Sequence, residues 1–433
     1  MFVAFVLVIS PIMFRVTLGA TKPVQAAQKV NHPFPQHVTY AKGTLKPSAK
    51  QSQKDKLTKS WYDTWKKNYV VKNPYSTKQT QYYVWTSGQT YSKTSKQTVP
   101  ICVSEGQGYG MLIMVYMAGY DKNAKKYFDG MYRYYKANTC ERGKYLMSWQ
   151  QADNGSEIVD WGGGSSATDG DLDIAYALLL ADKQWGSSGS INYKKAATNI
   201  IKDILKYEVN ATAYTIQLGN WASTLDKNNI QYTGLRSSDL MPGHFRAFAE
   251  ATNQSKWNKV VNKSFTILNQ LTIKSTRKTG LVSDFIVKGK KNYKPASDGF
   301  LEGSKDDSYG YNACRVPWRI GVDYLVTKTS KSEDMLTMLN AWIRKKTGDQ
   351  PEKIRSGYTL KGKAMESYYD MSFVAPFLVA SMCQDKNTKG AQAWVDSLWK
   401  VVSTSSTNNY YNDTVKLICM IIASGNYWTP DNI

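Results

Sequence analysis

Three short segments of the chain place carboxylates beside glycines and aromatic residues, an arrangement suited to acid–base chemistry or ligand binding. In the first, VSEGQGYGM, Glu105 stands among three glycines directly before an apolar, helix-like run. Glycines let a ligand approach the backbone closely, and the start of a helix favours negative charge. Glu105 is therefore either a catalytic carboxylate or an ordinary N-terminal helix charge, and the segment alone favours neither.

The second segment, ATDGDLDIA, carries Asp169, Asp171 and Asp173 at alternate positions before another helix-like run. The positive end of a helix dipole stabilises such charges, and the first aspartate could cap the helix. Capping accounts for one aspartate and not for three. A calcium loop that begins at Asp169 is excluded, because Ile174 and Leu180 occupy the positions that require Gly and Glu.

The third segment combines acids, an amide, an arginine and a tyrosine around a loop-to-helix junction: Glu302, Asp306, Asp307, Tyr311, Asn312 and Arg315. This mixture suits a polyhydroxylated ligand better than a packed core. Aromatic rings are abundant, with 13 Trp and 30 Tyr. Many of these lie near glycines and acids, where sugar rings can stack on them, although core packing is the commoner role for any single ring.

The composition narrows the chemistry further. Three histidines and five scattered cysteines lack the paired spacings of a zinc site, so we expect no metal and no cofactor. The odd number of cysteines argues against a disulfide framework and predicts buried free thiols. Fifty-six Lys and Arg against 34 Asp and Glu give a net charge of +22, which suits nucleic acid, an anionic cell envelope or simply a soluble basic surface.

A chain of 433 residues with 42% hydrophobic residues is long enough to bury a large core. Eleven segments show helical periodicity, and no series of alternating strands is apparent. The predicted helices are Gly110–Tyr120, Ala124–Ala137, Asp171–Trp185, Tyr193–Tyr207, Asp239–Ala251, Trp257–Leu271, Ala313–Val326, Glu333–Arg344, Tyr369–Met382, Ala391–Val402 and Asp413–Ala423. They recur about every 30 residues, one helix plus one loop. This pattern predicts an all-α toroid or solenoid, and the lack of a legible repeat favours a closed ring of helix pairs.

The N-terminal region is expected to be separate from this ring. Residues 1–26 are predicted to be a signal peptide, because an apolar stretch too short to span a bilayer leads to the small-residue pattern Val24-Gln25-Ala26. Arg15 interrupts the stretch and no basic start precedes it, so a retained anchor is the alternative. Residues 27–58, rich in Lys, Gln, Ser and Pro, are predicted to form a flexible basic tail. We therefore expect a secreted protein.

The carboxylate-bearing segments and several further short blocks of sequence resemble a known family. The run ATDGDLDIAYALLLADKQW, from Ala167 to Trp185, resembles the signature of glycoside hydrolase family 8 along its whole length. SEGQGYGM, MSWQ, RSSDLMPGHF and YNACRVPW resemble further blocks of that family in the expected order, and Asn426-Tyr427-Trp428 matches its usual ending. The resemblance implies a single (α/α)6 catalytic domain over residues 59–433. It also implies an open cleft and inverting hydrolysis of β-1,4-linked glucan, xylan or chitosan.

In inverting hydrolysis one carboxylic acid protonates the leaving oxygen, while a second carboxylate activates water on the opposite face of the sugar, with the two roughly 6.5–9.5 Å apart. The resemblance makes Glu105 the general acid. Its pKa must then be raised by burial or by nearby negative charge. Asp169 matches the family's active-site aspartate, which grips the sugar at the cleavage point, and Asp171 is the second choice.

One position departs from the common family pattern. Many members carry an aspartate base directly after the tyrosine of the last block, but here that residue is Asn312, and an amide cannot accept the proton. A subgroup with this asparagine takes its base from a glutamate in the preceding loop, which Glu302 matches, with Asp306 or Asp307 as alternatives. That subgroup includes chitosanases and mixed-linkage β-glucanases. The expected substrate-binding residues are Tyr109, Trp149, Asp171, Tyr311, Asn312, Arg315, Tyr410 and Tyr411.

The expected substrate is an uncharged β-glucan, because a protein of net charge +22 repels the polycation chitosan at long range. Chitosan stays open as a co-substrate or as the sole substrate. We expect a monomer without nucleic-acid partners, held near an anionic cell envelope by salt-sensitive attraction. A non-catalytic binding protein and a polysaccharide lyase are the competing classes, against which the retained carboxylates argue. A nucleic-acid binder has only the charge in its favour.

Overall fold

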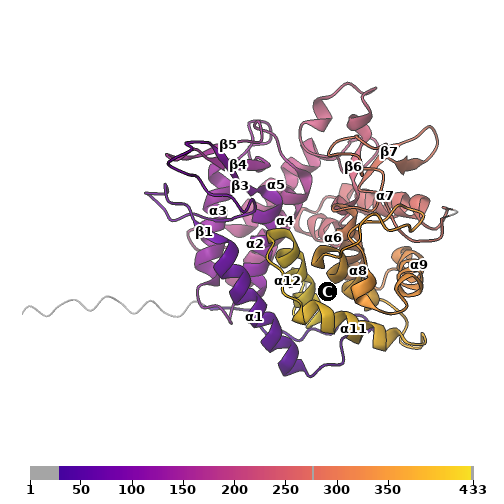
Figure 1. The fold of residues 1–433 in the computed structure, drawn as a ribbon. Coiled ribbons are helices and arrows are strands. Elements are labelled where there is room, and N and C mark those ends of the chain that lie inside the picture. Colours follow the sequence, from indigo (N-terminus) through magenta and orange to yellow (C-terminus); the bar gives the residue numbers. More distant parts are fainter. Residues whose placement is uncertain (1–28, 276, 431–433) are drawn as a thin grey trace, which may run out of the picture.

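The computed structural model describes residues 29–275 and 277–430, and in these residues twelve α-helices form two concentric rings (Figure 1). The inner ring consists of α2 (Ser104–Tyr116), α4 (Thr168–Trp185), α6 (Pro242–Thr252), α8 (Val316–Thr327), α10 (Met371–Ser381) and α12 (Tyr410–Ala423). The outer ring consists of α1 (Gln51–Tyr69), α3 (Ala124–Ala137), α5 (Tyr193–Tyr207), α7 (Lys256–Leu271), α9 (Ser330–Thr347) and α11 (Ala391–Thr404). Each inner helix packs against its two inner neighbours, and α12 contacts α2 and α1, which closes the ring. The predicted (α/α)6 barrel is confirmed.

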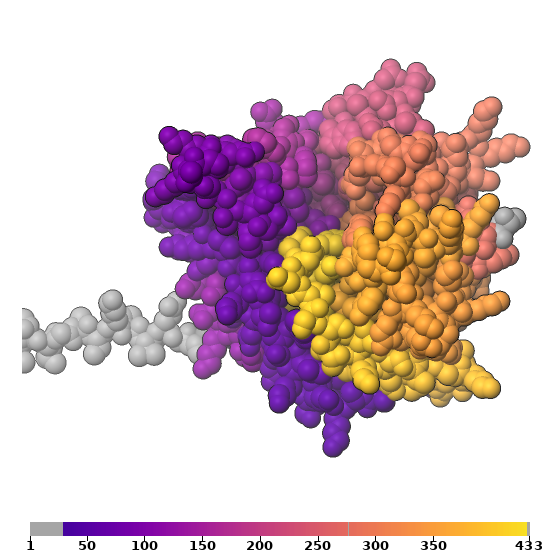
Figure 2. All heavy atoms as spheres, viewed as in Figure 1, coloured from indigo at the N-terminus to yellow at the C-terminus, as the bar shows by residue number. Residues whose placement is uncertain are grey.

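The two rings differ in sequence as their positions require. Two of the inner helices are buried on nearly all sides: α10 buries all of its residues, and α2 buries every residue except Glu105. Outer helices are amphipathic, as in α5, which buries only the helical stripe Tyr193, Ala197, Ile200, Ile201 and Ile204. The buried apolar side chains form one continuous core between the rings. Figure 2 shows the closure of the ring, because the C-terminal surface lies directly between the N-terminal surface and that of residues near 350.

All eleven predicted helices are present, but α1 (Gln51–Tyr69) was not predicted as one. Its buried face includes Lys54, Asp55 and Thr58 in addition to aromatic residues, so its first turns show no apolar period. Residues 51–58, assigned to the flexible tail, are therefore helical. The predicted signal peptide, residues 1–26, lies outside the described residues.

The other described part of the predicted tail is also packed on the barrel. Residues 31–45, here called the strap, run across the end of the barrel where the inner helices terminate. Backbone N–H groups of the strap donate to carbonyls at the C-terminal ends of five inner helices: Asn31 to Gln184, Phe34 to Ala118, Val38 to Gly425, Ala41 to Leu325 and Leu45 to Met382. Because the last carbonyls of a helix have no partner within the helix, the strap satisfies groups that are otherwise left to solvent. The structure thus replaces the expected flexible tail with a fixed segment.

Short strands, which were not predicted from the sequence, lie at the opposite end of the barrel. The described residues hold three small antiparallel sheets: β1 (Val70–Lys72) with β2 (Tyr82–Val84); β3 (Val99–Val103), β4 (Gln150–Asp153) and β5 (Ile158–Asp160); and β6 (Leu235–Arg236), β7 (Phe285–Lys288) and β8 (Tyr293–Pro295). Five 3-10 turns accompany them: Ala222–Thr224, Ile230–Thr233, Ser237–Asp239, Ala313–Arg315 and Pro351–Lys353. Strands of two to five residues are too short for a recognisable alternation. They matter because β3 continues directly into α2 and so fixes the direction of Glu105.

Two glycines allow α2 and α4 to approach closely. A Cβ atom on Gly108 would lie 2.8 Å from Cβ of Asp173 and 3.1 Å from the carbonyl oxygen of Gly170. A Cβ atom on Gly170 would lie 2.6 Å from the carbonyl carbon of Ser104. All three distances are shorter than ordinary contacts, so only glycine permits this crossing. The crossing brings the first turns of the two helices, and hence Glu105 and Asp169, to the same end of the barrel.

We expect Gly108→Ala to destabilise the fold by about 1–3 kcal/mol, because the added methyl group must push apart two packed helices. Gly243→Ala in α6 is the matched control, since its nearest neighbour would be Asp323 Oδ1 at 3.9 Å and alanine is the better helix former. Denaturant unfolding of both variants measures the difference. Equal stabilities would contradict the close crossing.

Candidate active site

A cleft of about 280 Å³ opens at the N-terminal ends of the inner helices. It is lined by Val103, Ser104, Glu105, Trp149, Ala167, Asp169, Arg236, Glu302, Tyr311, Asn312, Arg315 and Tyr411. The acids of all three sequence segments thus meet at one place. Eight of the predicted site residues are among these, while Tyr109, Asp171 and Tyr410 are not.

Arg315 is the centre of the hydrogen-bond network, with a side chain only 2% exposed. Its Nη1 donates to Glu105 Oε2 at 2.5 Å, to Asp169 Oδ2 at 3.0 Å and to the Tyr109 hydroxyl at 3.1 Å. Its Nη2 donates to Asn312 Oδ1 at 2.8 Å. One buried guanidinium therefore compensates two carboxylates that helix packing has brought together.

Glu105 lies in the first turn of α2, with its side chain 17% exposed at the cleft. Burial raises the pKa of its carboxyl to about 7; Arg315 opposes the rise and Asp169 adds to it. The hydroxyl of Tyr410 donates to Glu105 Oε1 at 3.2 Å, which favours the ionised form. The carboxyl can therefore carry a proton near neutral pH while it remains open to the cleft.

The pKa of Asp169 shifts in the opposite direction from that of Glu105, although Asp169 is more deeply buried. Burial alone would raise its pKa, but the charges of Arg236 and Arg315 together hold the pKa below its usual value. The nearer of the two, Arg315, donates at 3.0 Å, while Arg236 Nη1 lies 4.0 Å from Asp169 Oδ1. Below about pH 7 the two neighbouring acids are thus in different protonation states, a protonated Glu105 beside an ionised Asp169.

Glu302 stands on the loop that follows β8, and its side chain is 47% exposed. Arg236 Nη2 donates to its Oε1 at 2.7 Å, and Asn312 Nδ2 donates to its Oε2 at 2.8 Å. An exposed glutamate is normally free to change rotamer, but here both oxygens are fixed by buried donors. An aspartate at position 312 would instead set two carboxylates against each other.

The two neighbouring acids that were alternatives to Glu302 do not line the cleft. Asp306 is 3% exposed and accepts the backbone N–H groups of Leu301, Glu302 and Gly303, so it shapes the loop that carries Glu302. Asp307 is exposed and accepts the hydroxyl of Ser308.

Aromatic rings flank the carboxylates on two sides of the cleft. Trp149 is 38% exposed, and its carbonyl accepts the N–H of Ser104 at the start of α2. Tyr311, 43% exposed, stands across the barrel before α8, where its hydroxyl donates to Asp370. Tyr411 lines the cleft beside it and donates to the carbonyl of Tyr311. These faces can stack on sugar rings at both sides of Glu105.

The structure places two predicted substrate-binding residues elsewhere. Tyr109 is fully buried one turn below Glu105, where its hydroxyl accepts from Arg315. Asp171 is also fully buried: its Oδ1 accepts the N–H of Met147 at 2.8 Å, and burial beside Glu208 raises its pKa. Neither lines the cleft, so neither contacts a ligand bound there.

Two site residues were not predicted from the sequence. Arg236 begins the block RSSDLMPGHF, and a charged residue at the start of a matched block was the only available signal. Asp284 is buried behind the cleft, where its Oδ1 accepts the N–H groups of Gly310, Asn312 and Ala313. Burial raises the pKa of Asp284 to about 7. This aspartate fixes the turn that presents Tyr311 and Asn312, and no local motif distinguishes it.

Within residues 29–275 and 277–430, no group of three or more His, Cys, Asp or Glu side chains has the geometry to hold a metal ion. All five cysteines are buried and unpaired, and no helix of this part of the chain is long and apolar enough to cross a bilayer. The arrangement therefore offers carboxylate chemistry, with protonated and ionised acids facing one cleft between aromatic rings.

Known proteins share this arrangement of sequence and fold. The glycosyl hydrolases family 8 model matches residues 33–425. A β-glucanase of Niallia circulans is 44% identical over 400 residues, which are 92% of this chain and 92% of that protein. An endoglucanase of Bacillus sp. (strain KSM-330) is 39% identical over 94% of this chain and 84% of its own length.

Solved structures agree. The apo structure of a β-1,3-1,4-glucanase from Paenibacillus sp. X4 superimposes with a TM-score of 0.84 at 43% identity, covering 92% of this chain and 99% of that one. A cold-adapted family 8 xylanase, at 18% identity and a TM-score of 0.71, shares the fold. The chain belongs to glycosyl hydrolase family 8. It is an O-glycosyl hydrolase.

Proposed function

We propose that the protein is a secreted, endo-acting β-glucanase that hydrolyses β-1,4 linkages with inversion, on cellulose-like or mixed-linkage β-1,3-1,4-glucan. The observation that carries this proposal is that two carboxyls with different surroundings face one cleft. Glu105 has a pKa near 7, and Glu302 is fixed by Arg236 and Asn312. The names of the two curated relatives and of the Paenibacillus structure support a β-glucan substrate.

In this proposal Glu105 protonates the glycosidic oxygen as the bond to the anomeric carbon breaks. Glu302 removes a proton from the water that attacks that carbon from the opposite face. The guanidinium of Arg315 and the amide of Asn312 stand between the two carboxyls and link them only indirectly. This separation supports inversion, because an inverting enzyme must accommodate water between base and sugar. Asp169, ionised and beside the acid, binds the sugar at the cleavage point.

Asn312 supports placing the protein in the subgroup that lacks the usual aspartate base. Its amide bonds both Glu302 and Arg315, so it positions the base and does not replace it. Chitosan is the second candidate substrate, since that subgroup pattern occurs in chitosanases. Besides the proton donor Glu105, Asp169 and Glu302 line the cleft, but so do Arg236 and Arg315, and the net charge of +22 opposes a polycation at long range.

Endo action is supported by the position of the aromatic rings. Trp149 adjoins the start of α2 and Tyr311 precedes α8. A further exposed ring lies near each: the N–H of Trp161 bonds Gln150, next to Trp149, and Tyr368 hydrogen-bonds Tyr311. A groove with stacking surfaces on both sides of the acids suits binding in the interior of a chain. We further propose that the protein acts as a monomer and that its basic surface holds it near an anionic envelope.

We expect Glu302→Gln to lower kcat by about 10²–10⁴-fold, because the amide cannot accept the proton of water. Asp307→Asn on the same loop is the matched control and should keep kcat within about twofold, since Asp307 contacts only Ser308. Steady-state release of reducing ends measures both. Retained turnover in Glu302→Gln would exclude Glu302 as the base.

Activity should fall as the pH rises through about 7, because Glu105 then loses the proton that it must donate. Tyr410→Phe removes a hydrogen bond to the carboxylate, so the pKa of Glu105 rises and the alkaline limb of kcat/KM moves up by about 0.3–1 pH unit. Tyr69→Phe is the control: Tyr69 packs edge-on against Tyr410, but its hydroxyl bonds Asp413. A limb that stays in place, or moves to lower pH, would refute this assignment.

Substrate class is tested on barley-type mixed-linkage glucan, carboxymethyl cellulose, xylan and chitosan. The expected order places the two glucans first, and Glu105→Gln should abolish release of reducing ends on all of them. The anomer first formed, followed by proton NMR, should be α from a β-linked substrate. Preference for chitosan would select the second candidate, and a folded protein inactive on all four polymers would favour a non-catalytic binding protein.

A further inference from the structure

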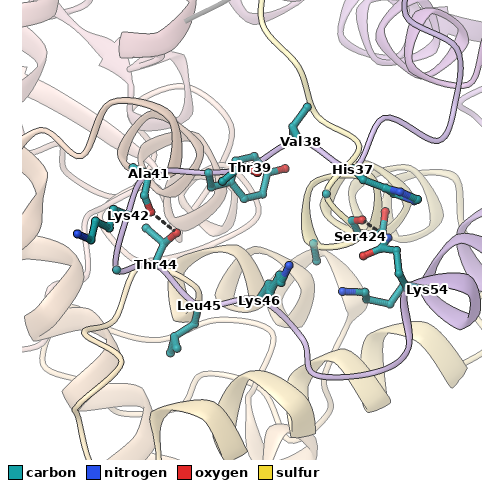
Figure 3. A pocket seen from close by; sticks show the side chains of 15 residues that line it. His37, Val38, Thr39, Ala41, Lys42, Thr44, Leu45, Lys46, Lys54 and Ser424 are labelled. Carbon is teal, nitrogen blue, oxygen red and sulfur yellow. Dashed lines mark hydrogen bonds between the residues drawn. The ribbon is translucent and has the colours of Figure 1, made fainter.

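A second cavity lies at the other end of the barrel, beneath the strap (Figure 3). Its volume is about 280 Å³, and its walls come from the strap, the first turn of α1 and the end of α12. The lining side chains that bear on the argument are His37, Lys42, Lys46, Gln51, Lys54 and Ser424. None of its lining residues lines the catalytic cleft, so this is a separate site.

The charge of the lining is entirely positive. Three lysines, Lys42, Lys46 and Lys54, line the cavity, and no Asp or Glu is among its lining residues. The ammonium groups of Lys46 and Lys54 lie next to each other in Figure 3, and the charge of Lys46 disfavours the charged form of Lys54. Like charges repel, so two adjacent ammonium groups facing a common space call for an anion between them.

The lack of an anion matters most for Lys54, because this residue is buried, with only 2% of its surface exposed. Its Nζ donates to the carbonyl of Pro47 at 3.1 Å and forms no ion pair within the described residues. Burial, with Lys46 in addition, lowers the pKa of Lys54. A buried ammonium group without a counter-charge is costly, whereas one with a bound anion is stabilised.

The carboxylates nearest to Lys54 are already engaged by other groups. Asp55 accepts from His37 and Gln51, and Asp396 accepts from the backbone N–H and the hydroxyl of Ser48. Both carboxylates favour the charged form of Lys54 from a distance, but neither contacts it. The negative charge that the cavity lacks must therefore come from outside the described chain.

The helix dipoles of α1 and α12 have opposite effects on an anion in the cavity. The N-terminal end of α1 faces the cavity with no acid in its first turn and no side-chain cap at Lys50, which favours an anion. The C-terminal end of α12 has the opposite sign. Two of its carbonyls are already satisfied, Ser424 by Gln51 Nε2 and Gly425 by the N–H of Val38, which reduces their pull on the lysines.

We propose that this cavity binds a phosphate group, held by the ammonium groups of Lys46 and Lys54 under the strap. Lysines bind phosphate as point charges, and no arginine is present to supply the planar fork that matches a carboxylate. A volume of about 280 Å³ admits a phosphate with a small attached alcohol and excludes a folded partner. The phosphate comes either from solution or from a phosphodiester polymer of the cell envelope, which would then anchor the enzyme.

The test is calorimetric titration of the full chain at pH 7 with inorganic phosphate and, separately, with poly(glycerol phosphate). Sodium chloride and sodium acetate at equal ionic strength are the reference titrations. We expect saturable phosphate binding that weakens about tenfold or more in Lys46→Met and in Lys54→Met. Lys290→Met, an exposed lysine remote from the cavity lining, is the matched control and should bind as the unmodified chain does.

Stability distinguishes a ligand site from a structural lysine. Lys54→Met should unfold at an equal or higher temperature than the unmodified chain in phosphate-free buffer. Phosphate should raise the Tm of the unmodified chain and of Lys290→Met, but not that of Lys54→Met. Tighter binding of the polymer than of the free ion would identify the envelope as the source, and the reverse would identify free phosphate.

Three results would overturn the proposal. These are equal heats with acetate or chloride, undiminished phosphate binding in Lys46→Met with its hydrolytic activity intact, and a lower Tm of Lys54→Met without phosphate. The last result would make Lys54 the structural counter-charge of the α12 carbonyls.

Discussion

The active end of this barrel depends on the compensation of buried charge in two stacked layers. In the upper layer Arg315 bonds Glu105 and Asp169; one turn deeper, Arg319 bonds Asp173 through both of its terminal nitrogens. The lower residues follow the upper ones by four positions, so each layer repeats one helical turn below the other. Removing one partner from such a buried pair leaves an uncompensated charge, which costs about 3–5 kcal/mol. Arg315, directly before α8, and Arg319, in the first turn of α8, thus supply the counter-charge for the acids of each layer.

Several other features of the fold follow from this requirement. The carboxylates reach Arg315 only if α2 and α4 cross closely, which Gly108 and Gly170 permit. The sheet of β3, β4 and β5 then fixes the start of α2, and Asp284 fixes the turn before α8 from behind. Catalytic precision thus comes from groups that never touch the substrate. Even the exposed acid of the cleft, Glu302, is held by two side chains of this buried network.

Helical periodicity was sufficient to predict a closed ring of helix pairs, and the family resemblance added the (α/α)6 barrel and the roles of the acids in short motifs. They failed where a residue's role depends on helix phase. Tyr109 follows Glu105 by a full turn, so it lies below the cleft, and Asp171 follows Asp169 by about 200° of rotation, so it faces Glu208 and not the ligand. The exact start of a helix determines these directions, and it is the least certain feature of a periodic pattern. Arg236 and Asp284 escaped notice because each acts across the fold, on Glu302 and on the turn at Asn312, from segments without a motif of their own.

The first turns of α1 and the strap were predicted to be a flexible tail for a related reason. Their contacts are mainly backbone hydrogen bonds to helix ends and buried polar side chains, which leave no apolar period in the sequence. Together they give the barrel two chemically opposite ends. Acids sit at the N-terminal ends of the inner helices, where the helix dipole supports negative charge, and lysines gather near the C-terminal ends. A net charge of +22 is therefore compatible with a cleft lined by Glu105, Asp169 and Glu302, because salt screens exposed charges that lie more than about 8–10 Å away.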